Sequence, residues 1–395
     1  MNQAPTKLFG QPIWARGFRA FFLAATVLSI LSMSLWMAVY LFHLPVPISS
    51  ISIFQWHAHE MIFGYSVAVI AGFLLTAARA WTGEETAQGP GLFLLFVLWT
   101  LARILMLCGS GFMFYAALAD LLFMLGLGIA LGRPIIKVGQ KRQAPVMLIL
   151  VLLTSANFLF YLGAMKGFPH ATRVGLHGGL YLLLGMVLFM GRRVIPLFTQ
   201  GGVGYPVELK NSRWNDIATF ILYPLFLINE VFFPQQLPGA GLAAGLFILN
   251  SIRVSTWHTL GIWSKPLLWS LFAAFIMINL GFLMRALMPV TAIPDFLPIH
   301  AYTVGGVGII TISMMARVTL GHSGRNVHQA PPIMMIILVG MVLSTFLRII
   351  LPLVDPAHYR VWIAASGLAW IISFAIFAIV FIPMLISPRV DGKPG

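Results

Sequence analysis

The stretch Trp56-His57-Ala58-His59-Glu60 stands at the start of an apolar run that extends to Ala80. A run of roughly 20 apolar residues is long enough to cross a bilayer as a helix. Two later apolar runs begin in a related way, one at His177 and one at His300. Histidine at the start of three membrane-length runs predicts a helical membrane protein with histidines gathered near one bilayer face.

Each of these runs also reaches an arginine near its far end. The intervals are 20, 16 and 17 residues, from His59 to Arg79, from His177 to Arg193 and from His300 to Arg317. Such intervals correspond to about 24 to 30 Å of helix, close to the thickness of the hydrocarbon core. The three histidines are 118 and 123 positions apart. We therefore expect a single transmembrane domain, residues 1–395, with three repeats of four helices at about 14–135, 136–255 and 256–390.

The composition supports a protein that crosses the membrane many times. Of the 395 residues, 59% are hydrophobic and 9% are charged, whereas a soluble domain has roughly 25% charged residues. The formal net charge of +14 is scattered between apolar runs, so membrane lipid is an expected partner and nucleic acid is not. The single cysteine, Cys108, lies in an apolar stretch and is expected to be buried. It excludes an internal disulfide and a cysteine-rich metal site.

Turn-forming residues divide the chain into apolar segments and predict an all-α fold with about twelve transmembrane helices. The predicted spans are residues 17–42, 56–80, 90–108, 111–132, 144–166, 173–198, 214–233, 237–255, 265–288, 298–320, 331–351 and 359–386. With twelve spans, both termini lie on the same side of the membrane. Of the 24 lysines and arginines, six fall on the other side, namely Arg103, Lys166, Arg173, Arg285, Arg348 and Arg360. The positive-inside rule then predicts that both termini are cytoplasmic.

This orientation places four histidines near the outer face, on three helices: His57, His59, His177 and His300. Imidazole is a common ligand of transition metals and of haem iron. One interpretation is that the four converge on a cofactor, and the other is that they are separate interfacial histidines hydrogen-bonded between helices. The sequence favours neither. A haem here would be held non-covalently, because the chain has no Cys-x-x-Cys-His motif.

The neighbours of these histidines add three expectations. On an α-helix, His57 and His59 are about 200° apart, so they cannot easily bind one metal ion. Glu60 is expected either to orient an imidazole or take protons, or to be a helix N-terminal carboxylate. Arg103 and Asp120 lie in adjacent apolar spans and predict a buried ion pair.

Several motifs together resemble the NnrS family over nearly the whole chain. They are Arg16-Gly17-Phe18-Arg19-Ala20-Phe21-Phe22, Trp56 to Tyr65 with Ala71 to Ala77, Arg193-Val194-Ile195-Pro196-Leu197-Phe198-Thr199, and His300 to Gly305 with Arg317 to Arg325. The resemblance implies a bacterial inner-membrane protein that carries haem and copper and takes part in the response to nitric oxide. It leaves open whether the protein is an enzyme, such as a haem-dependent oxidoreductase.

The triple four-helix plan also resembles that of haem–copper oxidases and nitric oxide reductases. Fold analogy of this kind does not carry function. The seventh span has no histidine, and the tenth offers His300 alone. These histidines cannot supply a three-histidine copper centre together with two haems.

If haem b is present, we expect it between the second and tenth spans, with His300 as one axial ligand. The opposing ligand is His57 or His59, and His59 is favoured because His57 shares a helix face with the small residues Gly64, Ala68 and Gly72. His57 and His177 would then serve copper, with Met61 or water as a further ligand, or would hydrogen-bond a small ligand. Arg173, four residues before His177, is the expected partner of a haem propionate.

Two functions from different classes follow. The first is a haem-binding membrane protein of the nitrosative stress response that binds or redox-processes nitric oxide or a related small ligand, with quinol or another electron donor. The alternative is a secondary transporter of a small solute or metal, because repeats of membrane helices are the usual plan of transporters.

Overall fold

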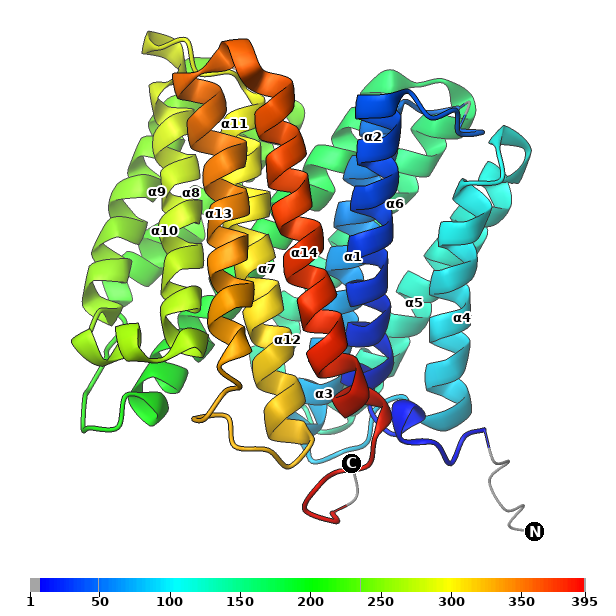
Figure 1. Cartoon of the computed structure of the whole chain (residues 1–395), viewed down its shortest axis with the longest axis vertical. Helices are drawn as coiled ribbons and strands as arrows, with labels where there is room; N and C mark the ends of the chain where they lie inside the picture. Colours follow the sequence, from blue (N-terminus) through cyan, green and yellow to red (C-terminus); the bar gives the residue numbers. More distant parts are fainter. Residues whose placement is uncertain (1–7, 49, 235, 394–395) are drawn as a thin grey trace. The chain divides into compact units, whose positions relative to one another are not determined.

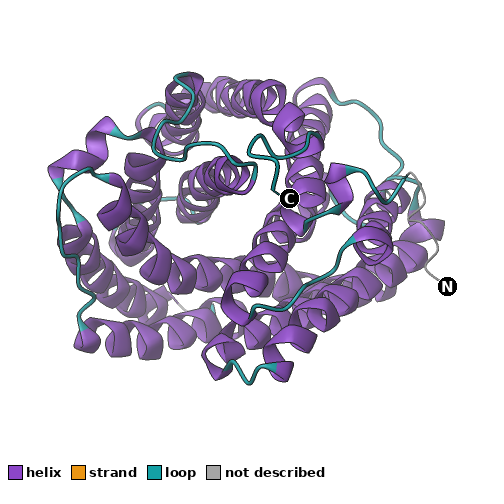
Figure 2. Ribbon diagram, turned by 90° about the horizontal axis from the view of Figure 1, so that it is seen from below, coloured by secondary structure: helices purple, strands orange, loops and turns teal. Residues whose placement is uncertain are grey.

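The computed structural model describes residues 8–48, 50–234 and 236–393, and in these ranges the chain forms helices, turns and loops without a strand (Figure 2). Within them, twelve helical segments are long and apolar enough to cross a membrane. The predicted number of spans and the all-α class are thereby confirmed. The helices, labelled in Figure 1, are α1 (Gly17–Phe42), α2 (Ile53–His59), α3 (Val67–Thr82), α4 (Gly89–Met106), α5 (Met113–Lys137), α6 (Ala144–Lys166), α7 (Pro169–Gly202), α8 (Arg213–Phe232), α9 (Gln236–Trp257), α10 (Pro266–Leu287), α11 (Phe296–His300), α12 (Ile309–His322), α13 (Ile333–Val354) and α14 (Tyr359–Ile386).

Two of the twelve spans change helix type directly after a histidine. The second span passes from α2 into the π-helical segment η2 (Glu60–Ser66) and then α3, and the tenth passes from α11 into η7 (Ala301–Gly308) and then α12. A π-helical turn shifts the side-chain register relative to a regular α-helix and often marks a functional site. The prediction that His57 shares one face with Gly64 assumed an uninterrupted α-helix, so it does not hold across η2.

Two compact units divide the described chain. The first unit comprises the residues up to Leu183, Met315–Val327 and the residues from Phe374 on, and the second comprises Leu184–Met314 and His328–Ser373. The predicted single domain and the predicted repeats stay predictions.

In the first unit, α1 packs against α3 and η2, while α5 packs against both α4 and α6. The close approach of η2 to α1 and α4 requires glycine at position 64. A Cβ there would lie 2.8 Å from a methyl of Leu28 on α1 and 2.9 Å from Nη1 of Arg103 on α4. The indole of Trp99 donates a hydrogen bond to the Gly64 carbonyl (3.1 Å). The π-helical segment is thus held against α1 and α4.

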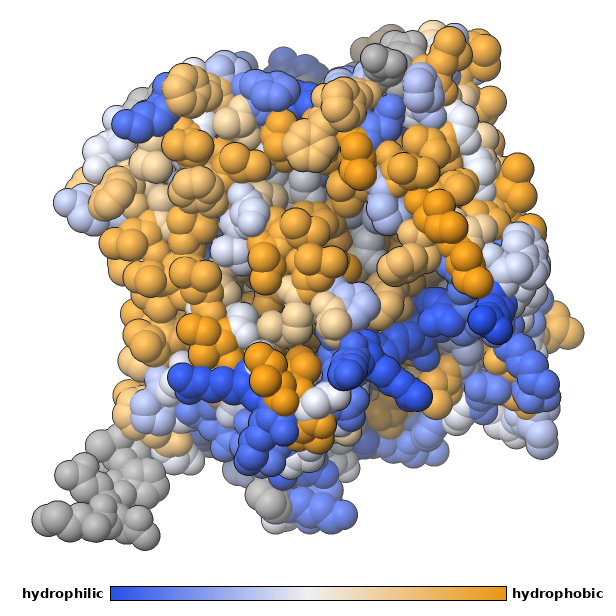
Figure 3. Space-filling model, turned by 180° about the vertical axis from the view of Figure 1, so that it is seen from behind, coloured by the Kyte–Doolittle hydropathy of each residue, from blue (hydrophilic) through white to orange (hydrophobic). Residues whose placement is uncertain are grey.

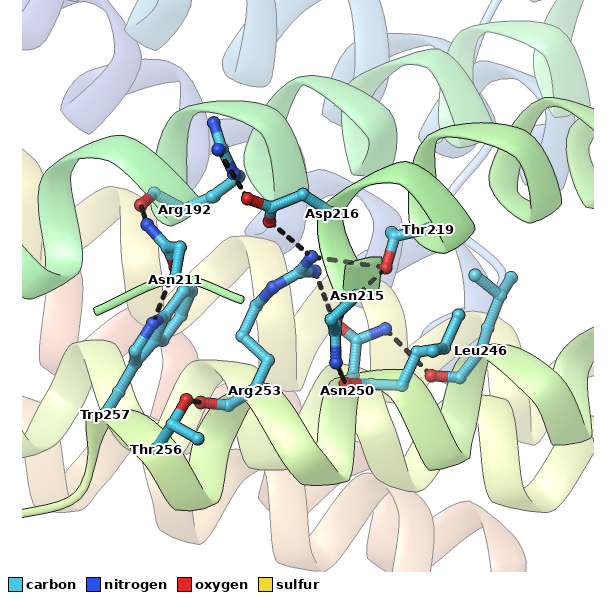
Figure 4. Close-up of polar contacts among 11 residues, drawn as sticks. Arg192, Asn211, Asn215, Asp216, Thr219, Leu246, Asn250, Arg253, Thr256 and Trp257 are labelled. Atoms are coloured by element: carbon cyan, nitrogen blue, oxygen red, sulfur yellow. Dashed lines mark hydrogen bonds and ion pairs between the residues drawn. The ribbon is translucent and has the colours of Figure 1, made fainter. Parts of the chain in front are cut away.

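In the second unit, α10 packs against α9 and η7, and α8 packs against α9. A polar cluster fastens α7, α8 and α9 together (Figure 4). Asp216 of α8 pairs with Arg192 of α7 at 2.5 Å and with Arg253 of α9 at 3.1 Å. Arg253 is 4% exposed and also donates to Thr219 of α8 (3.2 Å). This cluster links the three helices through one carboxylate that two guanidinium groups share.

The outer faces of the spans carry apolar side chains at helical spacing. On α5, for example, Leu118, Leu122, Leu125 and Ile129 are exposed, as expected for a helix side that faces lipid. Figure 3 shows hydrophobic side chains over the middle of one face and hydrophilic ones gathered toward its lower edge. The expectation that Cys108 is buried is wrong. It is exposed after the last turn of α4, and its thiol donates to the Ile104 carbonyl (3.3 Å).

Candidate functional site

A buried polar cluster surrounds the junction of α2 and η2 in the first unit. Its members come from four spans, and each side chain is at most 7% exposed. They are His59 at the end of α2, Glu60 at the start of η2, Arg103 on α4, Asp120 on α5, and Asn157 and Tyr161 on α6. Ionisable groups buried inside membrane spans are costly, and they commonly mark functional sites.

His59 is fully buried, and both of its ring nitrogens have partners. Nδ1 lies 3.1 Å from Oε1 of Glu60, and Nε2 lies 2.9 Å from Oδ1 of Asn157. The ring also stacks on Phe160 of α6, with centroids 4.3 Å apart. To ligate a metal, His59 would have to give up one of these two polar contacts.

The predicted ion pair between Arg103 and Asp120 is present, with Nη2 and Oδ2 2.5 Å apart. Arg103 also lies 3.5 Å from Glu60, so one guanidinium faces two carboxylates. The Asn157 amide and the Tyr161 hydroxyl both donate to Oδ2 of Asp120, at 3.0 and 3.1 Å. The pair is therefore part of a larger network that includes His59 and Glu60.

Hydrogen-bond chemistry fixes the number of protons in this network. The Asn157 amide nitrogen donates to Asp120, so its oxygen faces His59 and accepts from Nε2–H. Nδ1 of His59 and Oε1 of Glu60 are 3.1 Å apart, and two lone pairs at that distance would repel. One proton must therefore lie between His59 and Glu60, either on the imidazole or on the carboxyl group.

The charges lead to the same proton count. Two carboxylates and one guanidinium sum to −1, and the proton shared by His59 and Glu60 brings the cluster to neutrality. An uncompensated charge in a membrane interior costs several kcal/mol. The cluster can thus hold one proton in either of two places on adjacent residues without changing its total charge.

His177 and His300 share a different arrangement. Nδ1 of His177 lies 3.0 Å from the Arg173 carbonyl, and Nδ1 of His300 lies 2.7 Å from the Phe296 carbonyl. A carbonyl oxygen only accepts, so in each neutral imidazole Nδ1 carries the proton and Nε2 carries the lone pair. Iron and copper ligands commonly have this tautomer, fixed by a backbone carbonyl behind the ring.

Arg348 of α13 faces the Nε2 side of His300 in the second unit. Its Nη2 lies 3.0 Å from Nε2, and because arginine only donates, this contact confirms the tautomer. The guanidinium also lies over the rings of Phe296 and Tyr359, 5.5 and 5.8 Å from their centroids. Arg348 is 8% exposed, so a buried cation lies beside Nε2 of His300.

His57 lies against α1, as expected for a side chain directed at a neighbouring helix. Its ring is 4.8 Å from that of Trp36, and Trp36 stacks on Tyr40 at 5.0 Å. One turn along the chain, the Met61 sulfur accepts a hydrogen bond from Ser32 of α1 (3.6 Å). His57 and Met61, two of the side chains expected to serve copper, therefore border the same helix.

The family model described as NnrS protein matches residues 12–389. The chain belongs to the NnrS family. This family is linked to the response to nitric oxide. No curated protein is significantly similar to the chain.

In this NnrS-family protein, three of the four candidate histidines belong to the first unit and His300 belongs to the second. Among the described residues, the histidine, cysteine, aspartate and glutamate side chains form no group of three suited to hold a metal ion. His59 is the one candidate that the structure brings together with acidic side chains. The ligand roles of His57, His59, His177 and His300, and the role of Arg173, stay predictions.

Sequence reasoning missed Asn157, Tyr161 and Arg348. Asn157 and Tyr161 are four residues apart on α6 and so share one helix face. Two hydrogen-bonding side chains on one face of an apolar span are a signal for a buried polar partner. In the sequence Arg348 contributes only a charge to the orientation, although it lies within α13.

Proposed function

We propose that this NnrS-family protein binds haem b non-covalently and serves the nitric oxide response by binding or redox-processing nitric oxide or a related small molecule. The observation that carries the proposal is the shared tautomer of His177 and His300. In both, a carbonyl four residues earlier holds Nδ1 and leaves the lone pair on Nε2. In His300 this lone pair accepts from Arg348, so iron binding would require Arg348 to release it. Haem, when bound, supplies an iron centre that takes diatomic ligands and exchanges single electrons.

Accordingly, His177 of the first unit and His300 of the second are each proposed as an iron ligand within its own unit. His59 was favoured from the sequence, but its two nitrogens hold Glu60 and Asn157. We assign His59 the role of keeping a proton with Glu60. A proton held beside a reacting oxide of nitrogen is useful, because reduction of such molecules consumes protons.

Cationic side chains near the proposed ligands suit the propionates of haem. Arg348 touches His300, and the Arg173 backbone carbonyl holds His177. A buried guanidinium pairs strongly with a carboxylate through charge-assisted hydrogen bonds. We propose Arg348 and Arg173 as propionate partners.

Copper is proposed as a second cofactor, held by His57 with Met61. A thioether and an imidazole are ligands that suit copper. The two side chains lie near each other in the chain and border α1 through Trp36 and Ser32. Copper binding would require the Met61 sulfur to exchange its hydrogen bond from Ser32 for the metal.

The proposed setting is the bacterial inner membrane, with both termini in the cytoplasm and the histidines near the periplasmic face. Quinol or another donor would supply electrons. Whether the protein turns over its ligand as an oxidoreductase, or only binds it, is decided by measuring reduction of nitric oxide by the loaded protein.

Absorption spectroscopy of the detergent-purified full-length chain tests this proposal. Protein from haem-replete cells should show a Soret band that shifts when nitric oxide is added. His177→Ala and His300→Ala should each lose or convert the haem signal. His258→Ala is the matched control, because His258 is an exposed histidine that is not among the proposed ligands. Its Nε2 accepts a hydrogen bond from the nearby Trp263. Full haem with an unchanged Soret band in both ligand variants would overturn the assignment.

A secondary transporter is the second candidate function, and the His59 cluster favours it. Buried groups that exchange a proton are typical of proton-coupled transporters. Proteoliposomes that move a solute or metal after His57, His177 and His300 are all replaced would establish this function in place of the first.

A further inference from the structure

Arg19 lies at the third position of α1 and is 0% exposed. Its Nη1 donates to three carbonyls near the end of α14, those of Leu385 (2.8 Å), Ser387 (2.6 Å) and Met384 (3.4 Å). Its Nε and Nη2 have no hydrogen-bond partner among the described residues. An arginine side chain has five N–H donors, and leaving buried donors unsatisfied is costly. These donors therefore point to a ligand that accepts.

Two side chains at the end of α12 also have unsatisfied polar atoms. Oγ1 of Thr319, which is 0% exposed in the last turns of α12, and Nη1 of Arg325, just after α12, have no hydrogen-bond partner in the described parts of the chain. A threonine hydroxyl inside a helix usually donates to the carbonyl four residues earlier. The Thr319 hydroxyl does not make this hydrogen bond, so it can donate to another acceptor.

Contacts bring the ends of α1, α12 and α14 together. The ring of Phe18 lies 5.6 Å from that of His322. Beyond α14, Arg389 donates to the His322 carbonyl (3.1 Å), and the Val390 amide donates to the Ser323 carbonyl (3.1 Å). The residues with unsatisfied donors thus belong to one small region, at the lower end of α12 and α14 in Figure 1.

Positive charge is in excess in this region. Arg325 and Arg389 lie close enough to Arg19 to repel its guanidinium. Asp391 offsets only one of the three, because both of its oxygens bind Arg389, at 2.8 and 2.6 Å. A second anion beside Arg19 would relieve this repulsion and accept the unsatisfied hydrogen bonds.

We propose that Arg19, Thr319 and Arg325 form a binding site for a phosphate group. Guanidinium groups present parallel N–H donors that match phosphate oxygens, and a hydroxyl adds a neutral donor. The region lies where one candidate membrane span begins and two end, and the ends of spans are expected near lipid headgroups. The phosphate belongs to an anionic phospholipid or is free inorganic phosphate, and the chemistry of recognition is the same for both.

Native mass spectrometry of the full-length protein in detergent tests the site. The probes are phosphatidylglycerol, phosphatidylethanolamine as a zwitterionic comparison, and inorganic phosphate against chloride. Thr319→Val and Arg325→Gln should each bind the phosphate probe about tenfold more weakly, the size expected for one lost hydrogen bond to a charged group. Arg19→Gln also removes the contacts to the end of α14, so it is a supporting variant only.

Arg142→Gln is the matched control, because Arg142 is exposed in the turn before α6 and carries the same charge. If the protein retains phosphatidylglycerol in preference to phosphatidylethanolamine, and if this preference falls in the two site variants, the site binds lipid. Weaker binding of inorganic phosphate in those variants would identify a free phosphate site. Wild-type affinity in both Thr319→Val and Arg325→Gln, or an equal loss in Arg142→Gln, would overturn the proposal.

Discussion

Removing the carboxylate of Asp120 should strongly destabilise the protein. In Asp120→Leu, Arg103 keeps only Glu60 at 3.5 Å, and the Asn157 amide and the Tyr161 hydroxyl lose the oxygen to which they donate. All of these groups are buried. Breaking one side of a buried ion pair typically costs about 3–5 kcal/mol, because a charge is left without compensation. The free energy of unfolding should fall by roughly that amount.

Replacing both partners should cost less than the sum of the single changes. Arg103→Met alone leaves two carboxylates with one shared proton, a net charge of −1. In the double variant, His59, Glu60 and their proton remain as a neutral pair. We therefore expect a coupling energy of at least about 2 kcal/mol, in the range found for contacting residues.

Unfolding in mixed micelles, followed by circular dichroism as dodecyl sulfate is added, measures the four members of this cycle. Arg142→Gln again serves as the control for loss of a charge, and it should change the unfolding free energy by less than about 0.5 kcal/mol. Additivity of Arg103→Met and Asp120→Leu within about 0.5 kcal/mol would refute the account of the cluster as one charge-balanced network.

Three further predictions concern η2, the C-terminal segment and the topology. Gly64→Ala places a methyl group 2.9 Å from Arg103 and should lower stability in the same assay by about 1–3 kcal/mol; wild-type stability would refute the close packing of η2. Hydrogen bonding from Arg389 lowers the pKa of Asp391 to about 2. This contact therefore stabilises the C-terminal segment fully above pH about 4, and the stabilisation is lost as the pH falls through about 2. A spin label at Lys393 should report the loss as increased mobility of the segment. A reporter in the Gly139–Gln143 loop should behave as cytoplasmic, and periplasmic activity there would refute the proposed orientation.

The number of spans was predictable because the length and apolarity of a segment suffice to define a membrane helix. The Arg103–Asp120 pair was also predictable, since two opposite charges in adjacent apolar spans have few other ways to be stabilised. Both inferences depend on position along the membrane normal. A sequence specifies the depth of a residue in the membrane well when every span is a regular α-helix.

The direction in which each side chain points was harder to predict. The helical-wheel argument for His57 assumed about 100° per residue, and η2 breaks that rule directly after His59. The second polar partner of His59, Asn157, comes from α6, 98 positions later in the chain, and no local pattern identifies it. Cys108 shows the same limit, because an apolar neighbourhood fixed its depth but not whether it faces lipid or protein.

The π-helical segment η2 has a consequence for how this protein tolerates changes in chain length. A π-helical turn holds about one residue more than an α-helical turn, so deleting one residue within Glu60–Ser66 would let the span close into regular α-helix. α2 and α3 would keep their relative orientation, whereas the side chains between them would rotate by up to roughly 100°. The placement of Gly64 against Leu28 and Arg103 therefore depends on the number of residues in η2, and a one-residue deletion there should disturb these contacts while leaving His59 directed at Asn157.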